Sequence, residues 1–199
     1  ADRIRNEAGI PTIAVGAISA PSISLTANNG SIAQVGSLST SGLLNLQAGS
    51  GIQLTDSGNK VARLSARVTG AGDVDLVNTG VLSLEGVTTS AGSIRLVNTG
   101  GVTTGKDSVA ATGGGVSLKA NSPLTVGDGG VSATGDVNLE ATNLTSAGDV
   151  ILNGNVVSST GAVAITAAAS LTQNGKVTAA KGVTVASAGA VTFGANALT

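Results

Sequence analysis

The stretch Val74-Asp75-Leu76-Val77-Asn78-Thr79-Gly80 returns one repeat later as Ile94-Arg95-Leu96-Val97-Asn98-Thr99-Gly100. In each copy, a charged residue has one aliphatic residue before it and one after it. This alternation is typical of a strand that buries one of its faces. The glycine that ends each copy permits the sharp change of chain direction that a corner needs. The two copies therefore predict a short strand that recurs at a fixed period, as in repeat proteins.

Similar aliphatic pairs continue along the chain, mostly at a nearly constant spacing. The pairs are Ile23/Leu25, Leu44/Leu46, Val74/Leu76, Ile94/Leu96, Val116/Leu118, Val137/Leu139, Val150/Leu152, Val163/Ile165 and Val183/Val185. A second pair often follows shortly afterwards, as in Ile52/Leu54, Leu82/Leu84, Leu124/Val126 and Val191/Phe193. A third short strand precedes the glycine at 38–42, 131–135 and 157–161. Each unit of about 20 residues thus predicts three strands separated by glycine-rich turns.

This pattern predicts an all-β fold, namely a right-handed parallel β-helix with three short strands per turn of about 20 residues. Inward aliphatic side chains of successive turns would stack about 4.8 Å apart. The narrow interior that results accounts for the single aromatic residue, Phe193. A β-sandwich is the alternative all-β fold, but it does not need a long repeat of constant period. A disordered linker is disfavoured by the mean hydropathy of +0.37.

The repeat divides the chain into residues 1–21, predicted to be an N-terminal lead-in or cap, and residues 22–199, predicted to be the shaft of the β-helix. The pattern is irregular near 55–73, where Lys60, Arg63 and Arg67 fit the repeat only loosely. It is irregular again near 137–163, where the aliphatic pairs follow one another too closely and each interval lacks one strand of the unit. A shortened turn or an outward excursion would explain either irregularity.

The composition argues against several classes of function. The chain has no His and no Cys, which removes the usual nucleophile triads and most zinc sites. Its net charge of −1 and lack of stacking aromatic residues give no footprint for nucleic acid. No apolar run approaches the roughly 18 residues needed to span a bilayer. We therefore predict no enzyme activity and no catalytic residue, cofactor site or metal site, and the sequence identifies no binding residue.

Two groups of residues are candidates for a site. Polysaccharide lyase chemistry on a β-helix would need carboxylates and a basic residue on one face, for which the candidates are Asp73, Asp75, Glu85 and Arg95. Asp75 and Arg95 hold the same outward position in successive turns, so they are predicted to be neighbours in a solvated ladder. The stretch Gly127-Asp128-Gly129-Gly130 comes nearest to a calcium-binding repeat, but it occurs once and is interpreted as a turn.

The sequence resembles the repeats of filamentous haemagglutinin-like exoproteins of two-partner secretion. The similarity covers roughly residues 22–195 and rests on a small residue and glycine followed by two aliphatic residues one position apart. It is carried by Ala71-Gly72-Asp73-Val74-Asp75-Leu76, Ala91-Gly92-Ser93-Ile94-Arg95-Leu96, Thr134-Gly135-Asp136-Val137-Asn138-Leu139 and Ala147-Gly148-Asp149-Val150-Ile151-Leu152. The Asn-Pro-containing motifs of that family's secretion domain are not found. The resemblance implies a central shaft segment.

That resemblance implies export through an outer-membrane two-partner secretion pore, a secreted or bacterial cell-surface location, and a role in cell adhesion and virulence. The expected function is a structural shaft that holds a distal binding or effector module away from the cell. The alternatives are a face of the β-helix that directly binds a host-cell glycan or receptor, or a polysaccharide-acting enzyme. Unpaired strand edges at the two ends also predict end-to-end self-association.

Overall fold

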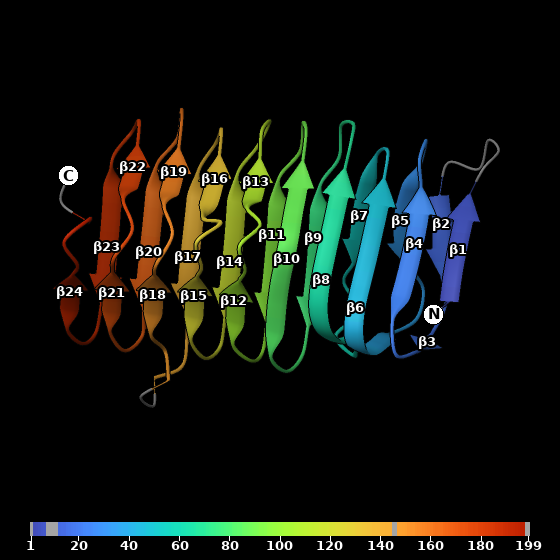
Figure 1. Cartoon of the computed structure of the whole chain (residues 1–199), viewed down its shortest axis with the longest axis horizontal. Helices are drawn as coiled ribbons and strands as arrows, with labels where there is room; N and C mark the ends of the chain where they lie inside the picture. The colour runs from blue at the N-terminus through green and yellow to red at the C-terminus, as the bar shows by residue number, and fades with distance from the viewer. Residues whose placement is uncertain (1, 7–11, 145–146, 198–199) are drawn as a thin grey trace.

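The chain folds as a solenoid of parallel β-strands, in which each coil stacks on the one before it (Figure 1). The computed structural model describes residues 2–6, 12–144 and 147–197. Within these ranges there is no helix, and so no helix able to cross a membrane. The strands form one sheet of fifteen strands and one of nine. Coils of about 21 residues repeat about nine times, which confirms the predicted β-helix and its period.

The nine-stranded sheet contributes one strand to every coil. Its strands are β2 (Thr12–Val15), β5 (Ser31–Gln34), β7 (Gly51–Leu54), β9 (Val74–Asn78), β11 (Ile94–Asn98), β14 (Val116–Ala120), β17 (Val137–Ala141), β20 (Val163–Ala167) and β23 (Val183–Ser187). We call its outer surface the nine-strand face.

The fifteen-stranded sheet supplies the other two sides of each coil. One side, the β12 face, holds β3 (Ile18–Ser19), β12 (Val102–Thr104), β15 (Leu124–Val126), β18 (Val150–Leu152), β21 (Leu171–Gln173) and β24 (Val191–Phe193). The other, the β13 face, holds β1 (Asp2–Asn6), β4 (Ile23–Ala27), β13 (Val109–Ala111), β16 (Val131–Ala133), β19 (Val156–Ser158) and β22 (Val177–Ala179). The long strands β6 (Leu38–Ala48), β8 (Lys60–Val68) and β10 (Leu82–Thr89) run across both.

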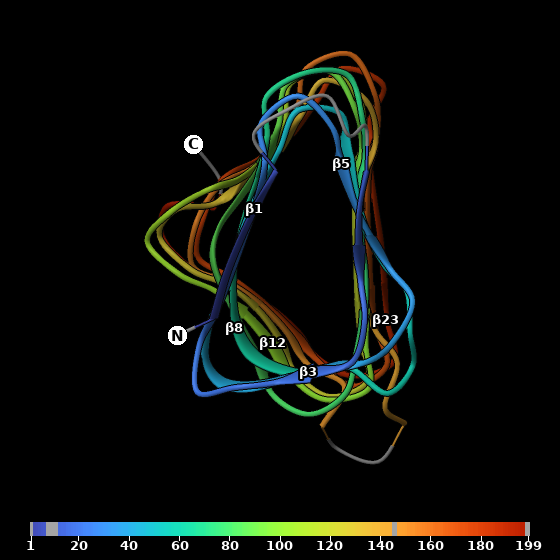
Figure 2. The ribbon, with the colours of Figure 1, turned by 90° about the vertical axis from the view of Figure 1, so that its right-hand side faces the viewer.

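Viewed along the axis, the coils enclose a roughly triangular section with β1, β3 and β5 on its three sides (Figure 2). The N-terminal end faces the viewer. The chain rises along β4, passes over the top and descends along β5 of the nine-stranded sheet while moving away (Figures 1 and 2). This clockwise path makes the solenoid right-handed, as predicted.

Continuous rows of aliphatic side chains fill the interior. One row on the nine-stranded sheet passes in register through Ile52, Val74, Ile94, Val116, Val137 and Val163. Each of these side chains is at most 2% exposed. No buried polar side-chain atom in the described part of the chain lacks a hydrogen-bond partner. The core is therefore apolar, its few polar groups are satisfied, and the predicted ladders are confirmed.

The irregular spacing near 137–163 arises from one long coil instead of two short ones. Val137 pairs directly with Val163, whereas Val150 pairs with Leu124 on the β12 face. The series of aliphatic pairs therefore switches faces at Val150/Leu152. The extra length lies between β17 and β18, where residues 142–149 form the connection, against 121–123 in the coil before. The prediction that a strand is missing here is wrong.

The same ambiguity affects the first part of the chain. Ile23/Leu25 and Leu44/Leu46 lie in the fifteen-stranded sheet, whereas the true predecessors of Val74/Leu76 in the nine-stranded sheet are Ile52/Leu54. All of these pairs alternate in the same way, so their pattern alone does not tell which sheet receives them. Every face keeps nearly the same spacing, which makes the mixed series look continuous.

Residues 55–73 contain a full-length strand, β8, and the coil that leads from Ile52 to its partner Val74 is not shortened. Its buried residues are Val61, Leu64, Ala66 and Val68, so the alternation skips once between Val61 and Leu64. The register with β6 and β10 also shifts near this point. The skip occurs where the strand bends from the β12 face to the β13 face, and it interrupts the regular alternation that marks the other strands.

The predicted lead-in, residues 1–21, includes three strands that pair with the coil after them. β1 pairs with β4, β2 with β5 and β3 with β6, all in parallel. Its strands therefore form the first coil, in the same sheets as residues 22–199. That this coil also caps the end stays a prediction.

Buried asparagines hold the corner between the nine-strand and β12 faces. Asn78 accepts a hydrogen bond from the Val61 amide at 2.7 Å and donates to the Val61 carbonyl and to the side chain of Asn98. Asn98 in turn donates to the carbonyls of Gly80 and Gly101. Both side chains are at most 2% exposed. They satisfy backbone groups that leave the regular ladder at the corner, where a bare carbonyl or amide would be costly.

A close approach of two backbones explains one of the recurrent glycines. Gly92 stands at the corner before β11, directly above Gly72 of the previous coil. A Cβ atom at Gly92 would collide with the carbonyl oxygen of Gly72. The glycine in the Ala-Gly-x-aliphatic motif is thus required here by packing between coils.

The last coil leaves its inward side chains uncovered. Val183, Val185, Val191 and Phe193 are 40–50% exposed, although Val163, Ile165 and Leu171, their neighbours in the coil below, are at most 1% exposed. Because apolar surface and open strand edges occur together at this end, we expect the isolated chain to self-associate as concentration rises. Light scattering or sedimentation velocity measures this directly.

The contribution of the open end to association can be isolated with one pair of variants. Val185→Lys places a charge on the inward surface and should shift the protein toward monomer. Thr184 lies on the same strand but points outward, so the variant Thr184→Lys should associate as the parent protein does. Monomeric behaviour of the parent at high concentration would contradict the prediction.

Candidate functional site

Outward side chains of the nine-strand face, most of them polar, form rows that follow the axis of the solenoid. The central row consists, in register, of Gln53, Asp75, Arg95, Ser117 and Asn138. A second row beside it consists of Val77, Val97, Lys119, Glu140 and Thr166. Successive residues of a row stand one strand spacing apart, about 4.8 Å. A ligand lying along the axis would therefore meet a new side chain at each coil.

Asp75 and Arg95 are direct neighbours in register, as predicted from their positions in the repeat. They nevertheless make no ion pair of 4 Å or less in the described structure, where the ion pairs are those of Arg63 with Glu85 and Lys119 with Glu140. Desolvation raises the pKa of Asp75, and the nearby Asp73 raises it further, whereas the charge of Arg95 lowers it. Ionisation of the carboxyl group therefore carries a cost that its basic neighbour does not cancel.

This balance makes stability depend on pH in a defined direction. The cost of Asp75 is present when its carboxyl group is ionised in the folded protein, and it vanishes below the unfolded value near 3.8, where both states are protonated. Asp75→Asn is therefore expected to raise the melting temperature modestly at pH 7, with the gain disappearing as pH falls below 4. Thermal denaturation from pH 3 to 8 measures it. A gain that persists unchanged at pH 3 would contradict the prediction.

The four residues considered for lyase chemistry do not meet on one face. Glu85 lies on β10 of the other sheet, 3.1 Å from Arg63. Hydrogen bonds from Ser83 and Arg63 lower its pKa. Asp73 is at the corner before β9, where its carboxylate accepts the amide hydrogen of Ser93 at 2.7 Å. Only Asp75 and Arg95 share a surface, so the expected cluster of carboxylates is not assembled.

Aspartates at the start of strands have a structural role that sequence reasoning missed. Asp136 accepts the backbone amide hydrogen of Ala162 at 2.8 Å, and Asp149 accepts that of Ser170 at 2.9 Å. In both cases, as with Asp73, the donor belongs to the following coil. Charge-assisted bonds of this kind are stronger than neutral ones. The sequence signal for this role is the recurrent motif Gly-Asp-Val, in which the aspartate links one coil to the next at a corner.

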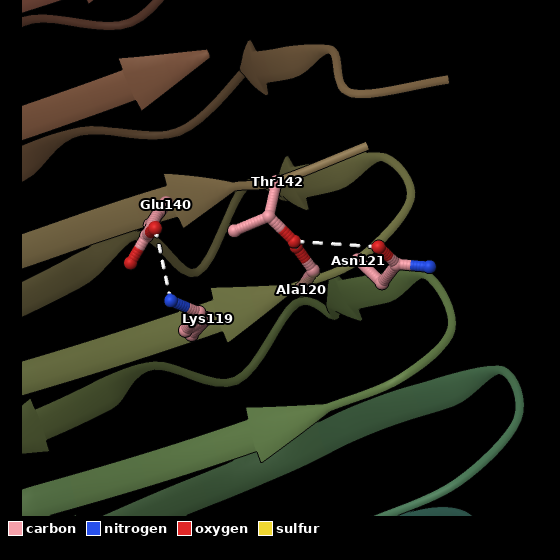
Figure 3. Close-up of polar contacts among 5 residues, drawn as sticks. All are labelled: Lys119, Ala120, Asn121, Glu140 and Thr142. Carbon is pink, nitrogen blue, oxygen red and sulfur yellow. Dashed lines mark hydrogen bonds and ion pairs between the residues drawn. The ribbon is translucent and has the colours of Figure 1, made fainter. Parts of the chain in front are cut away.

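Next to the central row, polar contacts link two adjacent coils (Figure 3). Lys119 of β14 and Glu140 of β17 form an ion pair at 3.0 Å. Just past the two strands, the Thr142 hydroxyl lies 3.3 Å from the Asn121 side-chain oxygen and 3.3 Å from the Ala120 carbonyl, and donates to both. These side chains form an ion pair or hydrogen bonds with a neighbour on the adjacent coil, whereas Asp75 and Arg95 do not pair with each other.

The glycine-rich stretches lie at corners. Residues 113–115 join β13 to β14, and residues 127–130 join β15 to β16, where Gly130 has a φ of +71°. This confirms the interpretation of 127–130 as a turn. No group of three or more Asp or Glu side chains in the described ranges is arranged to hold a metal ion.

Comparison with known proteins gives one family match. Residues 4–66, which include strands β2 to β7 and parts of β1 and β8, match a family model described as repeats of unknown function (DUF5649). This covers less than half of the chain, and it agrees with the repetitive architecture. No curated protein and no solved structure matches the chain.

Proposed function

We propose that this chain is a segment of the structural shaft of a large secreted or cell-surface bacterial exoprotein, an adhesin or a contact-delivery protein. The observation that carries the proposal is the unbroken parallel register of the nine-stranded sheet from β2 to β23. Such a rod keeps a distal module at a fixed distance, because each coil is bonded to both neighbours. The core needs no disulfide, in keeping with the absence of cysteine.

The mechanical part of the proposal rests on rigidity, which distance measurements can test. Gln53 and Thr184 are exposed positions of the central row, six coils apart. Spin labels at Gln53→Cys and Thr184→Cys should give one narrow distance distribution, with the backbones about 29 Å apart at about 4.8 Å per coil. The chain has no other cysteine to label. A broad distribution would contradict the role of a stiff shaft.

The location and partner follow from the repeat resemblance and are part of the same proposal. The chain would be exported through an outer-membrane two-partner secretion pore and would serve adhesion or delivery at the surface. Antibodies raised against this chain should label intact cells of the source organism. Labelling that appears only after the cells are permeabilised would overturn the surface location, whatever the rigidity of the rod.

A further inference from the structure

Two hollows adjoin Arg95 on the nine-strand face. One, of about 150 Å³, is lined by Thr55, Asp75, Val77, Arg95 and Val97, along with the backbone around Leu76. The other, of about 220 Å³, includes Arg95, Ser117, Asp136 and Asn138 in its lining. Arg95 lines both hollows, one on the side of the previous coil and one on the side of the next coil, and we call the two together the Arg95 groove.

The groove offers polar groups that other parts of the protein do not occupy. Arg95 and Asp75 make neither a hydrogen bond nor an ion pair within 4 Å among the described residues. Lys119 and Glu140 nearby are also direct neighbours in register, and they do form an ion pair, at 3.0 Å. A guanidinium that only donates and a carboxylate that only accepts therefore remain side by side and available.

The Arg95 groove also has an apolar part, which lies beside its polar side chains. Val77 and Val97 form a strip next to the polar row, and Val97 is 36% exposed. A sugar ring presents hydroxyl groups at its edge and C–H groups on its face, so it matches a polar row beside an aliphatic strip. The strand spacing of about 4.8 Å is also comparable to the length of one sugar ring, so consecutive rings would meet consecutive coils.

The charge of the groove selects among glycans. Asp75 and Asp136 outnumber Arg95, and Asp73 lies close by, so the surface is net negative. An acidic polysaccharide would be repelled, whereas hydroxyl groups can bond to carboxylate, amide and guanidinium alike. We propose that the Arg95 groove binds a short neutral oligosaccharide that lies along the axis, with Arg95 and Asp75 at its centre and Ser117 and Asn138 beyond.

Titration of the isotope-labelled chain with oligosaccharides, followed by NMR, tests this proposal. The probes are neutral gluco-, manno- and galacto-oligosaccharides of three to five units, and acidic oligogalacturonates of equal length. At least one neutral probe should shift amide signals of β9, β11, β14 and β17 and leave β4 and β6 unchanged. Absence of shifts with every neutral probe, or stronger binding of the acidic probes, would overturn the proposal.

Two arginine variants distinguish specific binding in the Arg95 groove from nonspecific binding to the protein surface. Arg95→Ala should weaken binding of the neutral probe at least tenfold. Arg67→Ala removes an exposed arginine from β8, outside the groove, and should bind as the parent does. Equal affinity of both variants and the parent would overturn the assignment of the groove. The distance measurement between residues 53 and 184 is independent of this result, so the shaft role and the glycan site stand or fall separately.

Discussion

Replacing Leu118 with alanine is expected to lower the free energy of unfolding by about 2–5 kcal/mol. The side chain is fully buried and stands in register between Leu96 of the coil below and Leu139 of the coil above. Its removal would leave a cavity between stacked side chains of a narrow interior. The backbones cannot close this cavity, since their hydrogen bonds fix the distance between coils. Chemical denaturation monitored by far-UV circular dichroism measures the loss.

The damage from Leu118→Ala should also be local. A solenoid is stabilised by contacts between nearest neighbours, so a weakened coil uncouples the two halves of the rod. Hydrogen exchange is therefore expected to accelerate most in β11, β14 and β17, and least in β4 and β6. The matched control is Lys119→Ala, which removes an exposed ion pair next to it and should cost at most about 1 kcal/mol. Equal losses for the two variants would refute the proposed contribution of the aliphatic ladder.

Replacing Asn78 with leucine is expected to cost at least about 3 kcal/mol, because each buried polar group that loses its partner costs about 1–3 kcal/mol. Leucine is similar in size and more apolar, so a gain in stability would be expected if burial alone mattered. Instead, the Val61 amide loses its acceptor, and the Val61 carbonyl and the Asn98 side chain lose a donor. Thermal and denaturant unfolding of the variant measure the balance.

The control for Asn78→Leu is the same substitution at an exposed asparagine. Asn121 lies just past β14, and its side-chain oxygen accepts a hydrogen bond from the Thr142 hydroxyl (Figure 3). Asn121→Leu should change the stability by no more than about 0.5 kcal/mol. If Asn78→Leu were as mild as this control, the buried asparagines would not be what secures the corner.

Sequence patterns were sufficient for the strands and the period, and insufficient for the corners. Alternating aliphatic residues such as Val74 and Leu76 face inward wherever a strand is regular, since the side-chain period of a strand is two. In β8 the alternation skips between Val61 and Leu64, because the chain bends across two faces. No local pattern announces such a bend, which depends on the strands above and below it.

The candidate site was foreseen only in part. The outward positions of Asp75 and Arg95 followed from the repeat, and their register is as predicted. Glu85 was grouped with them because the sequence does not tell on which sheet a strand lies, and it pairs with Arg63 on another face. The hollows beside Arg95 and the lack of an ion pair with Asp75 are properties of side-chain packing that no spacing encodes.

By itself, the sequence determined that the chain forms short strands with one buried side, coiled at a regular period, with small side chains inside. It did so because burial of aliphatic residues and the freedom of glycine at corners act locally and leave a periodic record. Only the tertiary structure decided which strand joins which face, that 137–163 spans a single long coil, and which charged side chains meet. Those choices depend on hydrogen bonds and contacts between successive coils, where strands with the same alternation are interchangeable until they are stacked.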